Sequence, residues 1–271
     1  MKYIVSRDNA RFRELKKLCH GGHERRKAGR IVLDGMHLIA AYTERFGPPD
    51  EVIVSETGAG RAEIARYLEN HPEMAATILA DALFAVLATV GTPSGIMAVA
   101  APPQGGQGAD PSADTVLLDG IQDPGNLGSI LRSAAAAGFR QILLSPDCAQ
   151  AWSPKTLRAA MGAHFSLDIH QDSDLPAFLS GYRGQALVTA PDATAELFTA
   201  ELGQPLAWIF GNEGQGVRPE VSKLAGKRIR IPMPGGAESI NVGAAAAVCL
   251  FETVRRRSGN QRTEDSKHGL G

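Results

Sequence analysis

The feature that most constrains this chain is a stretch in which an apolar strand runs into a polar loop and then into a helix. Residues 117–132 begin with Leu117 and Leu118, pass through a loop rich in glycine, proline and polar side chains, and end in a helical segment. Asn126 occupies the position expected for the helix N-cap, and Arg132 follows about two turns later. The loop thus presents a carboxamide and a cation at the carboxyl end of a strand, which is where ligands bind in open α/β sheets.

Two more glycine-rich loops follow apolar strands in the same half of the chain, at residues 211–216 and 232–241. The glycine order in the first matches neither the dinucleotide fingerprint nor the P-loop. Glu213 in that loop is either a ligand-binding residue or a helix-capping carboxylate. In the second loop, Ser239 is a good N-cap for the helix that follows, so the side chain of Asn241 is expected to face a site. Three such loops predict one composite site.

The length of 271 residues allows two modest domains or one large one. A content of 44% hydrophobic and 21% charged residues is typical of a soluble globular protein. A stretch rich in proline and glycine at residues 102–112 has little to bury and marks the best boundary. We therefore predict an N-terminal domain at 1–104, a linker at 105–114, a second domain at 115–257 and a disordered tail at 258–271.

Apolar strands alternate with helical patterns on both sides of this boundary, which predicts two α/β domains. In the second domain the strands are short and continuously apolar, as in a parallel sheet covered on both faces. The strands are expected near residues 31–33, 52–54, 96–100, 116–118, 141–144, 165–169, 186–189, 207–210 and 228–231. The helices are expected near residues 6–18, 36–42, 62–68, 83–87, 127–137, 154–161, 175–179, 219–224 and 240–256.

The formal net charge of −1 conceals two basic segments. Residues 1–30 carry ten lysines and arginines against three acidic residues, a net charge of +7, and Arg255, Arg256 and Arg257 form a second cluster. Either segment is suited to neutralising phosphates or to forming a solvated helix face, and the sequence leaves both interpretations open.

The three cysteines, Cys19, Cys148 and Cys249, are far apart and show no metal-ligand spacing. Neither a metal site nor a disulfide framework is expected, which fits a reducing cytoplasm. The start of the chain is charged too early for a signal peptide, and no apolar run is long enough for a membrane span. We therefore expect a cytoplasmic protein without metal or membrane partner.

Taken together, the three loops resemble the three motifs of the SpoU/TrmH family of RNA ribose 2′-O-methyltransferases in the SPOUT superfamily. Residues 119–132 resemble the family pattern D-x-x-x-D-P-x-N-x-G-x-x-x-R, and residues 209–216 resemble G-x-E-x-x-G. Residues 231–245 resemble I-P-M followed by S-L-N-V-x-x-A. The resemblance covers residues 115–256. Residues 1–100 more weakly resemble the substrate-binding domain that often precedes it, through residues 30–37 and 91–99.

The resemblance implies an α/β fold: a SPOUT-type parallel sheet with a C-terminal trefoil knot, preceded by a small α/β substrate-binding domain. It implies a homodimer, an RNA substrate and S-adenosyl-L-methionine as the cofactor. The residues that the family pattern assigns to cofactor binding are Gly211, Ile231 and Ile240. Those that it assigns to the catalytic cluster are Asn126, Arg132, Glu213, Ser239 and Asn241.

Two positions depart from common family residues, Ala135 in place of an acidic residue and Gly243 in place of a serine. Neither removes a core motif residue, so the departures bear on substrate choice. Arg132 is either an unusual base or a cation that orients a phosphate and stabilises a developing alkoxide, because a free guanidinium stays protonated. The alternatives to a methyltransferase are a non-catalytic RNA-binding protein on the same fold and a generic nucleotide-binding α/β enzyme. The separate N-terminal domain favours ribosomal RNA over transfer RNA.

Overall fold

The computed structural model describes the backbone of residues 2–88, 93–103 and 108–268. The chain divides into two compact units, one formed by residues 1–104 and 150–165 and the other by residues 105–149 and 166–271. In the described part of the chain, no helix combines the length and the apolar character that crossing a membrane requires.

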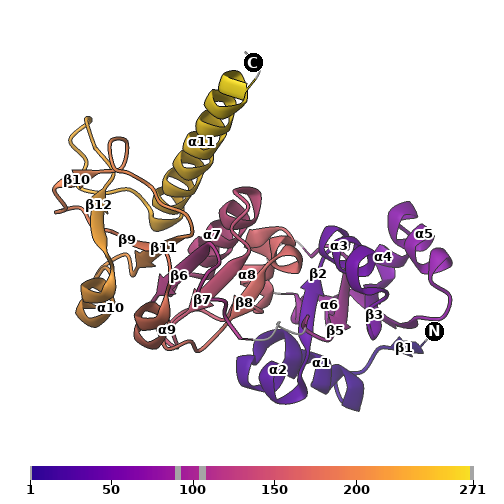
Figure 1. Ribbon diagram of the computed structural model, residues 1–271. Helices are drawn as coiled ribbons and strands as arrows, with labels where there is room; N and C mark the ends of the chain where they lie inside the picture. The colour runs from indigo at the N-terminus through magenta and orange to yellow at the C-terminus, as the bar shows by residue number, and fades with distance from the viewer. Residues whose placement is uncertain (1, 89–92, 104–107, 269–271) are drawn as a thin grey trace. The chain divides into compact units, whose positions relative to one another are not determined.

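The first unit is a mixed five-stranded sheet in the order β1-β4-β3-β5-β2, with helices on both faces (Figure 1). Its strands are β1 (Lys2–Ile4), β2 (Ile31–Asp34), β3 (Glu51–Ser55), β4 (Ala75–Leu79) and β5 (Ile96–Ala100). Its helices are α1 (Ala10–His20), α2 (Gly22–Ala28), α3 (Met36–Phe46), α4 (Glu56–Ala59), α5 (Ala62–Asn70), α6 (Asp81–Leu87) and α8 (Pro154–Ala160), and a 3-10 turn spans Ala163–Ser166.

Alternation along the strands divides the core of this unit into two clusters. Val32 faces the cluster that includes α1 and α6, whereas its neighbours Ile31 and Leu33 face the cluster that includes α3 and α5. Leu157 of α8 and Phe165 belong to the second cluster and are 0% and 5% exposed. This burial explains why residues 150–165 group with the first unit, whereas the sequence-based division places them in the second domain.

The second unit is a seven-stranded sheet in the order β10-β12-β9-β11-β6-β7-β8, and all its described strand pairs are parallel. Its strands are β6 (Thr115–Asp119), β7 (Gln141–Leu144), β8 (Asp168–His170), β9 (Gln185–Thr189), β10 (Ala195–Glu196), β11 (Leu206–Gly211) and β12 (Lys227–Arg230). Its helices are α7 (Pro124–Ala136), α9 (Leu175–Gly181), α10 (Pro219–Leu224) and α11 (Val242–His268). The predicted α/β fold with a parallel sheet is confirmed.

The packing and the strand register of the second unit determine where its loops lie. Leu117, Val188 and Ile209 face α9 and α10, while the indole of Trp208 on the other face donates a 3.1 Å hydrogen bond to Thr253 Oγ1 of α11. In the register of β11 with β6, Gly211 lies opposite Asp119. The loops that follow these two strands therefore leave the sheet side by side.

Several elements differ from the predicted ones. The strand predicted at 165–169 is a 3-10 turn followed by the short β8. Helix α2 and strands β1, β4 and β10 were not predicted. The helix predicted at 240–256 begins at Val242 and runs to His268, into the segment predicted as a disordered tail. Of the predicted linker, residues 105–107 lie outside the described residues, and the amide of Asp110 donates to Gln141 Oε1 at 2.7 Å.

The basic cluster in the middle of α11 is neutralised within the fold. Arg255 and Arg256 both bond the buried carboxylate of Glu252, and Arg257 bonds Asp114 at 2.9 Å. The pKa of Glu252 is lowered to about 2, mainly by the hydrogen bond from Arg255. The interpretation of these arginines as phosphate-binding groups is therefore disfavoured.

We predict that Leu157→Ala destabilises the first unit although residue 157 lies between two strands of the second. Truncating a fully buried leucine costs about 2–5 kcal/mol, through lost burial and the cavity left behind. Hydrogen exchange should then accelerate in β2 and α3 and stay unchanged in β6 and β11. Leu143→Ala, which truncates a leucine of the second unit's core, is the matched control and should give the opposite pattern. Faster exchange confined to the second unit in Leu157→Ala would contradict the grouping.

Candidate active site

The first loop of the site is organised by the cap of α7. The carboxylate of Asp123 accepts a 2.8 Å hydrogen bond from the amide of Asn126, and Pro124 occupies the first helical position. Asp123 is the N-cap, so the expectation that Asn126 fills this role is wrong. Asn126 lies in the first turn instead, where its carboxamide is not needed for capping and is available to other loops.

The third loop is organised by the cap of α11. Asn241 Oδ1 accepts hydrogen bonds from the amides of Gly243 at 2.9 Å and Ala244 at 3.3 Å. Asn241 therefore caps the helix, and the prediction that assigns this task to Ser239 is wrong. The other half of the same carboxamide still faces the site as predicted, because Asn241 Nδ2 donates to Asn126 Oδ1 at 2.8 Å.

The second loop completes a chain of hydrogen bonds. Asn126 Nδ2 donates to Glu213 Oε1 at 2.5 Å, so Asn241, Asn126 and Glu213 form a continuous series across all three loops. Of the predicted catalytic residues, these three are brought together although they are up to 115 positions apart in sequence.

Gly211 is required by the backbone of the second loop. A Cβ at this position would lie 2.3 Å from the carbonyl carbon of Gly216 and 2.3 Å from the amide nitrogen of Val217. The loop closes through reciprocal backbone hydrogen bonds between Asn212 and Gly216. A larger residue at position 211 would push this closure open.

A cavity of about 810 Å³ lies between the second and third loops and the ends of β9 and β12. The three residues predicted to bind the cofactor, Gly211, Ile231 and Ile240, all line it. Three members of the predicted catalytic cluster also line it: Glu213, Ser239 and Asn241. Apolar side chains of Met233 and Val242 also line it. The volume lies within the range of small-molecule sites.

Arg132 is the predicted catalytic residue that stands apart. Its side chain is exposed on α7, and within the described residues it makes no hydrogen bond or ion pair. Its guanidinium is therefore not neutralised by the fold.

Sequence reasoning missed three residues that shape the site. Asp119 at the end of β6 binds Arg218, and Asn212 Nδ2 donates to the carbonyl oxygen of Gly120 at 2.9 Å. The signal available in the sequence was the carboxylate of Asp119 at the end of an apolar strand. A carboxylate that is buried there needs a hydrogen-bonding or charged partner.

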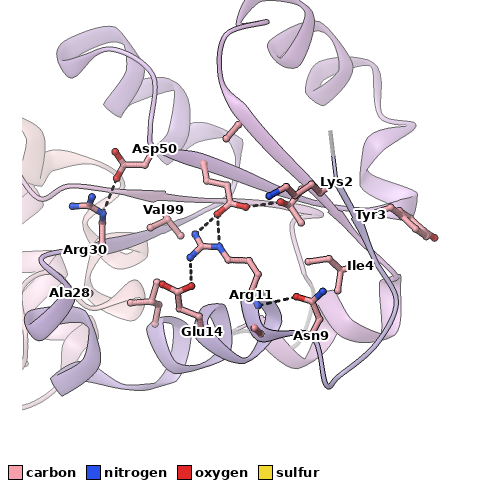
Figure 2. Close-up of a pocket in the computed structure, with 15 residues that line it drawn as sticks. Lys2, Tyr3, Ile4, Asn9, Arg11, Glu14, Ala28, Arg30, Asp50 and Val99 are labelled. Atoms are coloured by element: carbon pink, nitrogen blue, oxygen red, sulfur yellow. Dashed lines mark hydrogen bonds and ion pairs between the residues drawn. The ribbon is translucent and has the colours of Figure 1, made fainter.

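A second hollow, of about 970 Å³, lies in the first unit and contains none of the predicted site residues. Figure 2 shows that the arginines around it are engaged, since Arg11 contacts Glu14 and Arg30 contacts Asp50. In the described part of the chain, no group of three or more histidine, cysteine or acidic residues is placed to hold a metal ion.

Comparisons with known proteins identify the class. The model of the SpoU rRNA Methylase family matches residues 114–251. An uncharacterised tRNA/rRNA methyltransferase of Synechocystis is 32% identical over 94% of each chain. The 23S rRNA (guanosine(2553)-2′-O)-methyltransferase RlmP of Bacillus subtilis is 29% identical over 93% of this chain and 98% of its own.

A solved structure agrees with this assignment. The SpoU methyltransferase AviRb from Streptomyces viridochromogenes, in complex with the cofactor AdoMet, superposes with a TM-score of 0.80 at 26% identity. The match covers 93% of this chain and 100% of that one. The chain belongs to the SpoU family of methyltransferases, and the resemblance seen in its sequence is confirmed.

We predict that two substitutions of Asn241 separate its two tasks. Asn241→Asp keeps the oxygen that caps α11 but replaces the donor to Asn126 with a second acceptor, so it should unfold near the wild-type temperature and lose methyl transfer. Asn241→Ala removes both tasks and should also cost about 1 kcal/mol of stability through the lost cap. Thermal unfolding and methyl transfer measured on both variants check this. Full methyl transfer by Asn241→Asp would show that the Asn241–Asn126 hydrogen bond is dispensable.

Proposed function

We propose that this protein transfers a methyl group from S-adenosyl-L-methionine to a ribose 2′-hydroxyl of RNA, with ribosomal RNA as the substrate. The observation that carries the proposal is the Asn241–Asn126–Glu213 hydrogen-bond series beside the cavity that the second and third loops line. The B. subtilis relative named above, which matches nearly end to end, is named as a 23S rRNA 2′-O-methyltransferase and supports the choice of ribosomal RNA.

The cavity suits the proposed cofactor. Ile231, Met233 and Ile240 offer apolar surface to an adenine ring, and the loop at 211–216 offers backbone polar groups. The carboxylates of Glu213 and Glu238 also line the cavity and complement a cationic ligand. When bound, S-adenosylmethionine supplies an electrophilic methyl group on a sulfonium sulfur.

The residues of the chain then have separate roles. Asn241 holds Asn126, and Asn126 holds the carboxylate of Glu213, so the rim of the cavity keeps one arrangement as RNA enters. Ser239, exposed on the third loop, shapes the hydroxyl pocket. Arg132 orients an RNA phosphate and stabilises negative charge as it develops on the ribose oxygen, because no described carboxylate neutralises this exposed cation.

The proposal extends to a C-terminal trefoil knot and a homodimer, as the family resemblance implies. The knot is supported by the way in which the segment before α11 and the loop after β11 line one cavity. The dimer is supported by large apolar side chains that the second unit leaves exposed, Phe198 at 51% and Phe251 at 48%.

The test is methyl transfer from labelled S-adenosylmethionine to separate pools of unmodified ribosomal and transfer RNA. We expect label in the ribosomal pool, at a nucleotide that resists alkaline cleavage because its 2′-oxygen is methylated. Asn126→Ala should abolish the label, and Arg132→Lys should reduce it strongly, because an ammonium group lacks the planar fork that binds a phosphate through two hydrogen bonds.

The competing function is RNA binding without catalysis. Cofactor binding without label in either pool would favour it. Label confined to transfer RNA would contradict the substrate but leave the reaction in place. Near-normal activity of Arg132→Lys would exclude any role that needs the planar guanidinium.

A further inference from the structure

Eight of the ten cations of the first thirty residues fall into two groups, and Lys2 and Arg7, which precede α1, belong to neither. Arg11 donates to Glu51 at 2.9 Å, Arg25 is buried and donates to the carbonyl of Leu18 at 2.8 Å, and Arg30 pairs with Asp50 at 3.0 Å. A second group on α1 and α2 is exposed, and its side chains make no hydrogen bond or ion pair with any described residue. This group, here called the basic ridge, consists of Arg13, Lys16, Lys17, Arg26 and Lys27.

The helical period explains why the ridge stays free. Phe12, Leu15 and Leu18 turn one face of α1 into the core, so Arg13, Lys16 and Lys17, at helical spacings of three and four, share a different face. Arg11 and Glu14 lie between the two faces and border the hollow in Figure 2. The two helices of the ridge lie side by side in Figure 1.

We propose that the basic ridge contacts the phosphates of the RNA substrate, an inference that rests on the proposed function. Five cations that the fold does not neutralise form a surface suited to a polyanion, and folded RNA is recognised largely through its backbone. The paired arginines of the same segment keep the unit folded and do not contact RNA.

The test compares two double variants that each remove two exposed lysines. Lys16→Gln/Lys17→Gln removes part of the ridge. The control, Lys223→Gln/Lys227→Gln, removes two exposed lysines of the second unit whose side chains likewise make no hydrogen bond or ion pair with any described residue. Glutamine is a good helix former, so α1 should remain folded. Affinity for an unmodified RNA hairpin is measured against salt concentration, and we expect the log–log slope to fall by about two for the ridge variant alone.

Methyl transfer by the same proteins completes the experiment. The ridge variant should require more RNA for half-maximal rate and reach the wild-type maximum. Equal salt slopes in the two variants would overturn the proposal that the basic ridge contacts RNA phosphates, even if the wild-type protein methylates RNA normally. Absence of methyl transfer by wild type would count against the proposed function, while the salt slopes still decide whether the ridge binds RNA.

A second inference concerns the buried end of β6. The side chain of Asp119 is 1% exposed, and its two oxygens accept hydrogen bonds of 2.8 Å from the backbone amide and from Nε of Arg218. Arg218 lies two residues after the glycine-rich loop at 211–216. At the start of that loop, Asn212 binds Gly120 through Nδ2 and accepts from the amide of Gly214 at 2.8 Å through Oδ1.

The loop that carries Glu213 is therefore anchored at both ends to the two residues that end β6 and begin its loop. We infer that Asp119 and Arg218 are positioning residues that hold the loop where Glu213 meets Asn126. The ion pair acts from outside the cavity, since neither residue lines it. Removing the arginine would leave the buried carboxylate of Asp119 without a cation, which is strongly destabilising. We expect the loop at 211–216 to shift as a result.

Arg218→Met tests this, with Arg228→Met as the matched control because Arg228 forms an exposed ion pair with Asp192 in the same unit. Without any cofactor, amide hydrogen exchange across residues 212–217 should accelerate in Arg218→Met alone. Affinity for S-adenosylmethionine should fall about tenfold, the scale of one hydrogen bond between charged groups. Arg218→Lys should recover part of both effects.

Unchanged exchange in Arg218→Met and in the isosteric Asp119→Asn would overturn the positioning role. If wild type fails to bind S-adenosylmethionine, the proposed function fails, and the exchange measurement still decides whether the ion pair holds the loop.

Discussion

The site depends on the parallel pairing of β6 with β11. Their register sets Gly211 opposite Asp119, so the loops that leave the two strands start from adjacent points at one edge of the sheet. Antiparallel pairing would send these loops to opposite ends, and the contact between Asn126 and Glu213 would be impossible. The chemistry proposed for the cavity is in this sense a consequence of strand direction.

The polar residues at this edge act on the backbone as much as on a ligand. Asn241 caps α11 with one half of its carboxamide and binds Asn126 with the other, and Asn212 links its own loop to Gly120. A group that serves both the fold and the site is fixed more firmly than one held by the site alone. It is also harder to interpret, because its loss changes stability and geometry together.

The sequence predicted the parts of the fold in which one pattern has one physical meaning. Continuous apolar runs identified β6 and β11, and glycine-rich loops identified where the site lies. The cap of α7 was misassigned because Asp123 and Asn126 are both good caps, and Pro124, which favours the first helical position, was the signal that separates them. The placement of Leu157 in the other unit was not predictable, since periodicity shows that a face is buried but not against what.

Charge shows the same limit. The sequence contains two basic segments that look alike, yet the fold gives Arg255 and Arg256 to Glu252 and leaves Lys16 and Lys17 in water. Net charge counts cations, whereas binding a phosphate requires a cation that no carboxylate of the protein already holds. Arg132 fulfils the same condition within the second unit, where it is exposed and has no partner in the described part of the chain. The cations that the fold leaves free, rather than the segments richest in them, are therefore the ones to assign to the RNA.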